Sequence, residues 1–231
     1  MFFDLGETLV TQNIEDNLVT KKALERLSNE LVTNKTPEQL FELYNRGYQH
    51  NQPIRSTHNV EIPITSWMRE LLRHAVGEEP SAELVGKAAK IVVESRATNA
   101  KEYPDARGAL DELESRCRIG VISNVSSHDV AFEILRHVGF DKYVDLLVTS
   151  ASIGIRKPDP GIFLYSLSQM NVEADQSVHV GDHPVNDVDG AYSVGIQTAL
   201  ILRSETSTTK GVVRPWVTLK DLNGLPALIL R

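Results

Sequence analysis

Between residues 105 and 202 the sequence alternates regularly between amphipathic helical segments and short apolar runs. Short apolar runs bounded by turn residues are typical of buried strands, and such an alternation is the pattern of a parallel sheet with crossover helices. The predicted elements are helix 105–114, strand 119–122, helix 129–138, strand 146–149, helix 158–170, strand 178–180, helix 187–194 and strand 198–202, with a marginal edge strand at Val217. The fold class is therefore α/β.

The first strand of this sheet is predicted at the start of the chain. Phe2 and Phe3 form a short apolar run that leads directly into Asp4, and Gly6 then breaks the strand pattern. Asp4 is thus placed at the carboxyl end of a strand, the edge where open parallel sheets bind ligands. An aspartate after a strand is also a common turn former, so Asp4 alone does not indicate a site.

Residues 14–100 carry a different pattern, in which four amphipathic helices follow one another. These helices are predicted at 17–31, 36–48, 65–76 and 81–92, and the segment 47–63, with Pro53 and Pro63, is predicted to be a polar loop. A chain of 231 residues is long for one compact domain. We therefore expect a core of residues 1–13 and 101–231 that carries residues 14–100 as a helical insertion.

Composition and charge limit the classes of partner. The net charge is −7 and the Lys and Arg residues are scattered, which argues against a nucleic-acid surface. No apolar run approaches the length of a membrane span, and the chain opens within a strand, which leaves no room for a cleavable signal. Cys117 is the only cysteine. These features favour a cytoplasmic protein that acts on a small molecule, and they do not indicate an oligomeric state.

Residues with useful chemistry follow three of the strands. Asp182 and Asp187 flank a tight loop after strand 178–180, and right-handed crossovers would bring both close to Asp4. Three carboxylates in one crevice require a compensating charge, and Lys157 alone is not enough, so a hard cation such as Mg²⁺ is expected. Ser123 follows another strand, where its hydroxyl and the next backbone N–H can hold an anionic oxygen.

Together these motifs resemble the haloacid dehalogenase superfamily. The residues that carry the resemblance are Phe3-Asp4-Leu5-Gly6-Glu7-Thr8-Leu9, Val121-Ile122-Ser123-Asn124, Lys157-Pro158-Asp159-Pro160, and Val180-Gly181-Asp182 followed by Asn186-Asp187. The resemblance covers essentially the whole chain. It implies a Rossmannoid core with strand order 5-4-1-2-3 and a mobile helical cap, residues 14–100, inserted between the first and second motifs.

The resemblance also implies roles for individual residues. Asp4 would be the nucleophile that forms an aspartyl intermediate, and Lys157 would neutralise the site. Substrate binding would fall to Thr8, Ser123 and Asn124. Outside the family motifs, Arg55 in the segment 47–63 is either an anion contact from the cap or a solvated loop arginine. Mg²⁺ would be held by Asp4, the Gly6 carbonyl, Asp182 and Asp187, where it lowers the repulsion between an anionic nucleophile and a phosphoryl group.

Gly6 departs from the pattern of the family's phosphatases, which have a second aspartate there as general acid and base. A glycine can still offer its carbonyl to the metal, so metal binding should survive while proton transfer suffers. A positioned acid or base contributes ~10²- to 10⁴-fold, so poor leaving groups should be affected most. Glu7 is either a substitute for the missing acid or a solvated loop residue.

The activity that this resemblance implies is Mg²⁺-dependent hydrolysis of a small phosphorylated molecule. Family dehalogenases also lack the second aspartate, which makes carbon–halogen hydrolysis an alternative, but they also lack the Gly-Asp pair that Gly181 and Asp182 form here. Phosphonate hydrolysis needs a cap lysine, and the lysines of residues 14–100 read as ordinary helix-face charges. A low-turnover binding or regulatory protein is a further alternative, which Gly6 supports and the retained nucleophile opposes.

Overall fold

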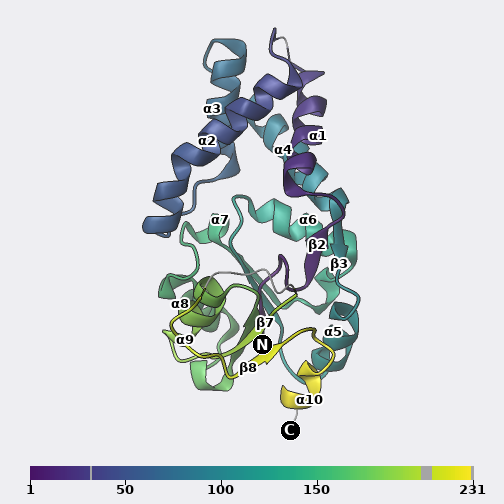
Figure 1. The fold of residues 1–231 in the computed structure, drawn as a ribbon, viewed down its shortest axis with the longest axis vertical. Helices are drawn as coiled ribbons and strands as arrows, with labels where there is room; N and C mark the ends of the chain where they lie inside the picture. Colours follow the sequence, from purple (N-terminus) through teal and green to yellow (C-terminus); the bar gives the residue numbers. More distant parts are fainter. Residues whose placement is uncertain (32, 204–209, 230–231) are drawn as a thin grey trace.

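The computed structural model describes residues 1–31, 33–203 and 210–229, and these residues contain a six-stranded parallel sheet (Figure 1). Its strands lie in the order β5-β4-β1-β6-β7-β8. The strand bounds are β1 Phe2–Phe3, β4 Gly120–Ser123, β5 Leu146–Thr149, β6 Val178–Gly181, β7 Gln197–Ile201 and β8 Val217–Leu219. The α/β fold class is confirmed. The five strands of the predicted order lie in that order, and β8, where a marginal edge strand was predicted at Val217, adds a sixth strand beside β7.

The central strand β1 is short but buried on both faces. Successive side chains of a strand point to opposite faces, so Phe2 and Phe3 enter different parts of the core. Phe3 packs in the cluster that includes α5 and α6, whereas Phe2 packs with residues of α8, and both side chains are fully buried. A Cβ at Gly120, which pairs with Phe2, would lie 2.7 Å from the Phe2 ring, so glycine makes room for it.

Helices cover both faces of this sheet and connect its strands (Figure 1). The bounds are α5 Ala106–Glu114, α6 His128–Val138, α7 Ser150–Ile153, α8 Pro160–Met170, a π-helix Pro184–Asp189, α9 Gly190–Tyr192 and α10 Leu225–Ile229, with 3₁₀ turns at Asp141–Tyr143 and Ala174–Gln176. The single helix predicted at 187–194 is therefore wrong. The His183 ring caps the start of the π-helix by accepting hydrogen bonds from the N–H groups of Val185 and Asn186, and the chain then passes directly into α9.

Four helices form a bundle above the carboxyl ends of the strands (Figure 1). This helical bundle consists of α1 Asp16–Ser28, α2 Pro37–Thr57, α3 Ile64–Val76 and α4 Ala82–Asn99. Its helices bury a cluster of their own around Leu24, Leu40, Met68 and Leu72, separate from the clusters on the sheet. None of the described helices combines the length and apolar character needed to cross a membrane.

Helix α2 corrects the sequence prediction of a loop over residues 47–63. The helix continues to Thr57 with Pro53 inside it. An internal proline costs about 3 kcal/mol of helix stability. Tertiary contacts oppose this cost, because Arg55 in the last turn is buried and its guanidinium lies 4.9 Å from the centre of the Trp67 ring. Local sequence signals could not show those contacts.

A two-stranded antiparallel ribbon joins the helical bundle to the sheet. It pairs β2 Val10–Gln12 with β3 Ala100–Glu102, at the two places where the chain enters and leaves the bundle. The sequence analysis did not predict this ribbon, because three residues are too few to show a strand period. The two crossings therefore lie side by side, next to the loop that follows Asp4 (Figure 1).

Candidate active site

Asp4 lies where β1 ends, at the centre of the sheet's carboxyl edge. Its backbone N–H donates to the Val180 carbonyl at 2.8 Å, which continues the pairing of β1 with β6 for one more residue. The Asp4 side chain is buried, and its Oδ1 accepts a hydrogen bond of 2.6 Å from the Lys157 ammonium group. The position at a strand end agrees with the sequence prediction.

Lys157 is a buried cation that connects several strand ends. Its Nζ donates to Asp4 Oδ1 and to Asp187 Oδ1, both at 2.6 Å, and to the Ile122 carbonyl at 2.8 Å. Burial opposes the charged form, but Asp187 and Asp4 together raise the pKa of Lys157. The Asn124 side chain exchanges two 2.8 Å hydrogen bonds with the Lys157 backbone and so fixes the start of this segment.

Asp187 is the most completely bonded carboxylate of the site. Its Oδ1 accepts from Lys157 and lies 2.9 Å from His179 Nε2, and its Oδ2 accepts from the His183 N–H at 3.0 Å. Although burial opposes ionisation, Lys157 and His179 hold the pKa of Asp187 well below its usual range. A Cβ at Gly181 would lie 2.2 Å from Asp187 Cγ, so only glycine lets this carboxylate reach its place.

Asp4, Asp182 and Asp187 form an acidic cluster in which each offers an oxygen within 4.8 Å of the others. Burial and the nearby Asp4 and Asp187 carboxylates raise the pKa of Asp182 to about 7. Burial likewise raises the pKa of Asp4 to about 6, against the opposing effect of Lys157. Closely spaced carboxylate oxygens are the donor set that Mg²⁺ prefers, so the residues fit a hard divalent cation.

The loop after Asp4 has space at Gly6, where the sequence departs from the expected pattern. Gly6 is exposed, its φ is not positive, and a Cβ there would meet no atom within 4 Å. The residue with positive φ is Glu7, at 52°. The Glu7 carboxylate accepts hydrogen bonds from Thr11 at 2.8 Å and from the Tyr103 hydroxyl at 2.5 Å, so it is tied to the β2–β3 ribbon.

Ser123 and Thr8, which are also predicted to contact the substrate, are both buried. Ser123 ends β4 beside Asp4 and is largely buried. Thr8 is fully buried, and its hydroxyl has no hydrogen-bond partner within the described part of the chain. The Thr8 carbonyl accepts from Arg203 at 2.5 Å. Binding of substrate by Thr8 and Ser123 stays a prediction.

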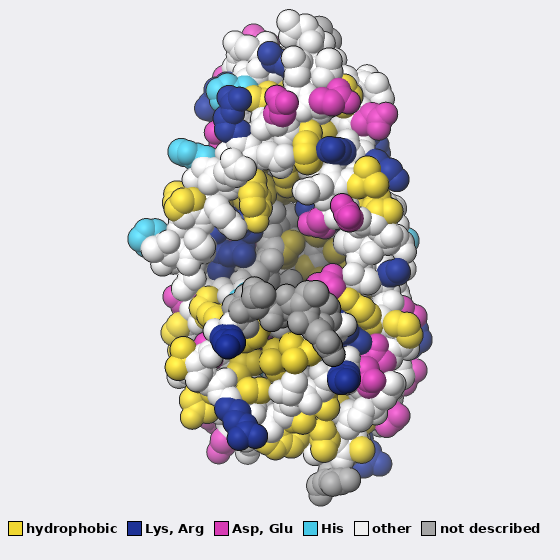
Figure 2. Space-filling model, viewed as in Figure 1, with side chains coloured by type: hydrophobic (Ala, Val, Ile, Leu, Met, Phe, Trp, Pro, Cys, Tyr) yellow, Lys and Arg dark blue, Asp and Glu magenta, His cyan; other side chains and the backbone are white. Residues whose placement is uncertain are grey.

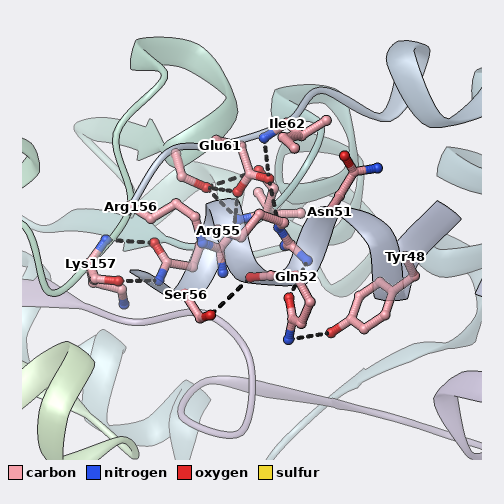
Figure 3. A network of polar contacts seen from close by, with 12 residues as sticks. Tyr48, Asn51, Gln52, Arg55, Ser56, Glu61, Ile62, Arg156 and Lys157 are labelled. Carbon is pink, nitrogen blue, oxygen red and sulfur yellow. Dashed lines mark hydrogen bonds and ion pairs between the residues drawn. The ribbon is translucent and has the colours of Figure 1, made fainter. Parts of the chain in front are cut away.

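A hollow separates the helical bundle from the sheet, and Lys and Arg side chains line one wall of it (Figure 2). On that side, a cavity of about 410 Å³ is lined from the bundle by Arg55 and from the sheet's edge by Asn124, Arg156, Lys157 and His183, among others. Arg55, predicted as an anion contact, therefore lies in the same cavity as residues of the site. In Figure 3 it is seen beside Glu61 and Arg156.

A family model described as "Hydrolase: haloacid dehalogenase-like hydrolase" matches residues 1–195. The chain belongs to this family. The matched range contains the whole acidic cluster, Lys157 and the helical bundle. Membership confirms the family that the sequence motifs resemble, which is a family of hydrolases by its description.

Individual relatives of this haloacid dehalogenase-like hydrolase include proteins with phosphatase names. A pyrimidine 5′-nucleotidase of Escherichia coli, YjjG, is 27% identical over 243 residues, with 100% of this chain and 97% of the nucleotidase covered. Haloacid dehalogenase-like hydrolase domain-containing protein 3 of Xenopus laevis is 42% identical over 108 residues, 46% of this chain. The chain spans 43% of that protein's length. A solved 2-haloacid dehalogenase of Pseudomonas syringae shares the fold, with a TM-score of 0.74, 24% identity and coverage of 100% and 97%.

The structure of the hydrolase also brings forward residues that sequence reasoning missed. His179 is fully buried behind Asp187, and Glu61 is buried between two arginines. His179 lies between two valines in strand β6, and a histidine in an otherwise apolar strand was the sequence signal that could have marked it as a residue of the site. Glu61 had no such signal, because two of its partners, Ser150 and Arg156, lie 89 and 95 residues away in the sequence.

Proposed function

We propose that this hydrolase cleaves phosphate esters of small molecules in an Mg²⁺-dependent reaction with Asp4 as the nucleophile. The observation that carries the proposal is the acidic cluster gathered around buried Lys157 at the carboxyl edge of the sheet. Relatives named as a pyrimidine 5′-nucleotidase and as a phosphatase support it. Phosphate release from an ester such as 4-nitrophenyl phosphate, measured with Mg²⁺ and after chelation, tests it.

In this reaction Asp4 would attack phosphorus with the carboxylate oxygen that Lys157 does not hold. The bond from phosphorus to the leaving oxygen breaks as the bond to Asp4 forms, and water then attacks phosphorus to release phosphate and restore Asp4. The Ser123 hydroxyl and the Asn124 N–H would bind phosphoryl oxygens, and Lys157 would offset their charge. Mg²⁺, held by Asp4, Asp182 and the Gly6 carbonyl with support from Asp187, would supply electrostatic stabilisation of the phosphoryl group.

We propose that the helical bundle, within residues 14–100, serves as the cap over this site. The hollow between bundle and sheet supports this role, because a substrate entering it would meet both (Figure 2). The β2–β3 ribbon would form the hinge, since both chain crossings run through it. Closure of the bundle would exclude water from the site while the leaving group departs.

Asp182 is expected to be required for Mg²⁺ affinity. An Asp182→Asn protein should bind Mg²⁺ at least about tenfold more weakly, because even residues that only support metal ligands contribute ~10- to 100-fold. Calorimetric titration of parent and variant measures the change. The exposed Asp141, changed to asparagine, serves as the matched control. Equal Mg²⁺ affinity in the parent and the Asp182→Asn protein would remove Asp182 from the metal site.

Gly6 is expected to limit the hydrolysis of esters with poor leaving groups, because no carboxylate is positioned there to protonate the leaving oxygen. Glu7 cannot take over while it is bonded to Thr11 and Tyr103. A Gly6→Asp protein should hydrolyse alkyl phosphates ~10-fold faster or more, a fraction of the general-acid range. The open space at Gly6 and its ordinary φ should let the variant fold.

The Gly6→Asp comparison is made with 4-nitrophenyl phosphate and glycerol 3-phosphate, alongside a melting curve. The gain should be small for the nitrophenyl ester, whose leaving group needs no proton. A folded, Mg²⁺-binding variant with no gain on any alkyl phosphate would show that a missing acid does not limit this enzyme.

Carbon–halogen hydrolysis is a second candidate, and Gly6 is the observation that favours it. Attack of a carboxylate on carbon with loss of halide needs no acid at this position. Against it stands the acidic cluster, since halide displacement has no use for a bound cation beside the nucleophile. Parallel assays of phosphate and halide release separate the two candidates.

A further inference from the structure

Two arginines of the hydrolase share a single buried carboxylate where the helical bundle meets the sheet (Figure 3). Arg55 lies in the last turn of α2, and its Nε donates to Glu61 Oε1 at 3.2 Å. Arg156 Nη1 donates to the other oxygen, Glu61 Oε2. Glu61 also accepts from Ser150 Oγ at 2.5 Å and from the Ile62 N–H at 3.0 Å. Two guanidinium groups and one carboxylate leave one positive charge in excess.

The two arginines retain donors that the protein does not use. Among the described residues, the acceptors of these side chains are Glu61 and, 3.5 Å from Arg55 Nη1, the Gln52 side chain. A guanidinium carries more N–H donors than these contacts occupy. Burial and the charge of Arg55 lower the pKa of Arg156 in spite of Glu61, which agrees with incomplete neutralisation.

The arginine pair is also held in place before any ligand binds. The Arg55 guanidinium lies 4.9 Å from the Trp67 ring centre and 5.5 Å from that of Tyr48. The Arg156 N–H donates to the Asn59 carbonyl at 2.7 Å, which joins the loop after α2 to the segment before Lys157. Donors fixed in this way lose little entropy when an anion binds, which favours affinity.

The cavity of about 410 Å³ places the arginine pair beside the proposed phosphoryl site. Arg55 and Arg156 line it together with Asn124 and Lys157. Lys157 reaches Asp4 through its Nζ, and the Asn124 N–H is proposed to bind the phosphoryl group. A small molecule in this cavity would therefore contact Asn124 and Lys157 as well as the two arginines.

We propose that Arg55 and Arg156 bind a second anionic group of the substrate, and that the enzyme prefers phosphate monoesters carrying a carboxylate or another phosphate. This inference rests on the proposed phosphatase function. A planar anion matches the fork of guanidinium donors, and hydrogen bonds between charged groups are the stronger kind. A neutral group would leave the excess charge uncompensated. Since one arginine belongs to the bundle and the other to the sheet side, the anion would also hold the two together.

Matched pairs of esters test the subsite. The pairs are 3-phosphoglycerate with glycerol 3-phosphate, and glucose 1,6-bisphosphate with glucose 6-phosphate, so each pair differs in the second anion. The parent enzyme should show a kcat/KM roughly 10- to 100-fold higher for the member with the second anionic group in at least one pair. The pair that shows the preference tells whether a carboxylate or a phosphate is the preferred group. No preference in either pair would overturn the proposal.

Variants then assign the preference to the arginines. Arg156→Gln and, separately, Arg55→Gln should each lower kcat/KM for the ester with the second anionic group about 10-fold or more beyond any change for its partner ester, whereas the exposed Arg136→Gln protein should keep the parent's preference. Two variants are used because each removes a bond to the buried Glu61, and melting curves report whether each variant is folded. Retention of the preference in both folded variants would contradict the proposal.

Binding distinguishes failure of the subsite from failure of the proposed chemistry. Calorimetry with the Asp4→Asn protein measures affinity for 3-phosphoglycerate and glycerol 3-phosphate without turnover. Tighter binding of 3-phosphoglycerate that Arg156→Gln abolishes supports the subsite even if no ester is hydrolysed, in which case the proposed function alone fails. Equal affinity for these two compounds, and also for glucose 1,6-bisphosphate and glucose 6-phosphate measured in the same way, would reject the subsite even if 4-nitrophenyl phosphate is hydrolysed.

Discussion

In an Asp4→Asn protein, phosphate-ester turnover is expected to fall by roughly 10³-fold or more, because an amide cannot form the acyl phosphate and loss of a nucleophile normally costs this much. The asparagine oxygen can still accept the Lys157 hydrogen bond, which is 2.6 Å long in the parent. The change also removes one of three crowded carboxylates. We therefore expect a melting temperature at or above that of the parent when no divalent cation is present.

The readouts for Asp4→Asn are the kcat on 4-nitrophenyl phosphate and a melting curve. Asp141→Asn, at an exposed position, controls for the chemical change itself and should retain the parent's kcat. Turnover by the Asp4→Asn protein within about tenfold of the parent would rule out Asp4 as the nucleophile.

In a Lys157→Met protein, both activity and stability are expected to fall strongly. Removing the ammonium group leaves Asp4, Asp187 and the Ile122 carbonyl without their shared donor in a buried place. Breaking a buried ion pair from one side costs about 3–5 kcal/mol of folding free energy. Loss of an electrostatic donor to the transition state should lower kcat by ~10²- to 10³-fold.

A second substitution separates these two effects of Lys157. In the Lys157→Met, Asp187→Asn double variant, the buried uncompensated charge is reduced, so part of the lost stability should return while activity stays low. Denaturant unfolding and the 4-nitrophenyl phosphate assay give the two readouts, and exposed Lys101→Met is the control. A Lys157→Met protein as stable and as active as the parent would show that the lysine does not hold the site together.

The positions of the strand-end residues could be predicted, because they follow from the local pattern that marks each strand and from the parallel arrangement of the strands. Short apolar runs marked the strands, and parallel topology then brought Asp4, Asp182 and Asp187 to one edge, where the structure places them. The contact of Lys157 with two of these carboxylates completes the arrangement. The contact between buried His179 and Asp187 could not be predicted in this way, because it depends on how the π-helix after β6 folds back toward that strand.

The side of the cavity that the helical bundle contributes could not be predicted, because contacts between residues far apart in the sequence determine its structure. Pro53 indicated a loop, yet α2 runs through it to bury Arg55. Glu61 and Arg156 are 95 residues apart in the sequence, and neither stands in a recognisable motif with the other. The residues that we infer to select the substrate are therefore the ones that only the three-dimensional structure brings together.

The most direct test of the proposed chemistry compares two products of the parent enzyme. Inorganic phosphate released from 4-nitrophenyl phosphate and chloride released from 2-chloropropionate are measured side by side, each with Mg²⁺ and after chelation. The account predicts phosphate release that requires Mg²⁺ and no chloride release under either condition. Chloride release that continues after chelation, with no phosphate released from the ester, would contradict it.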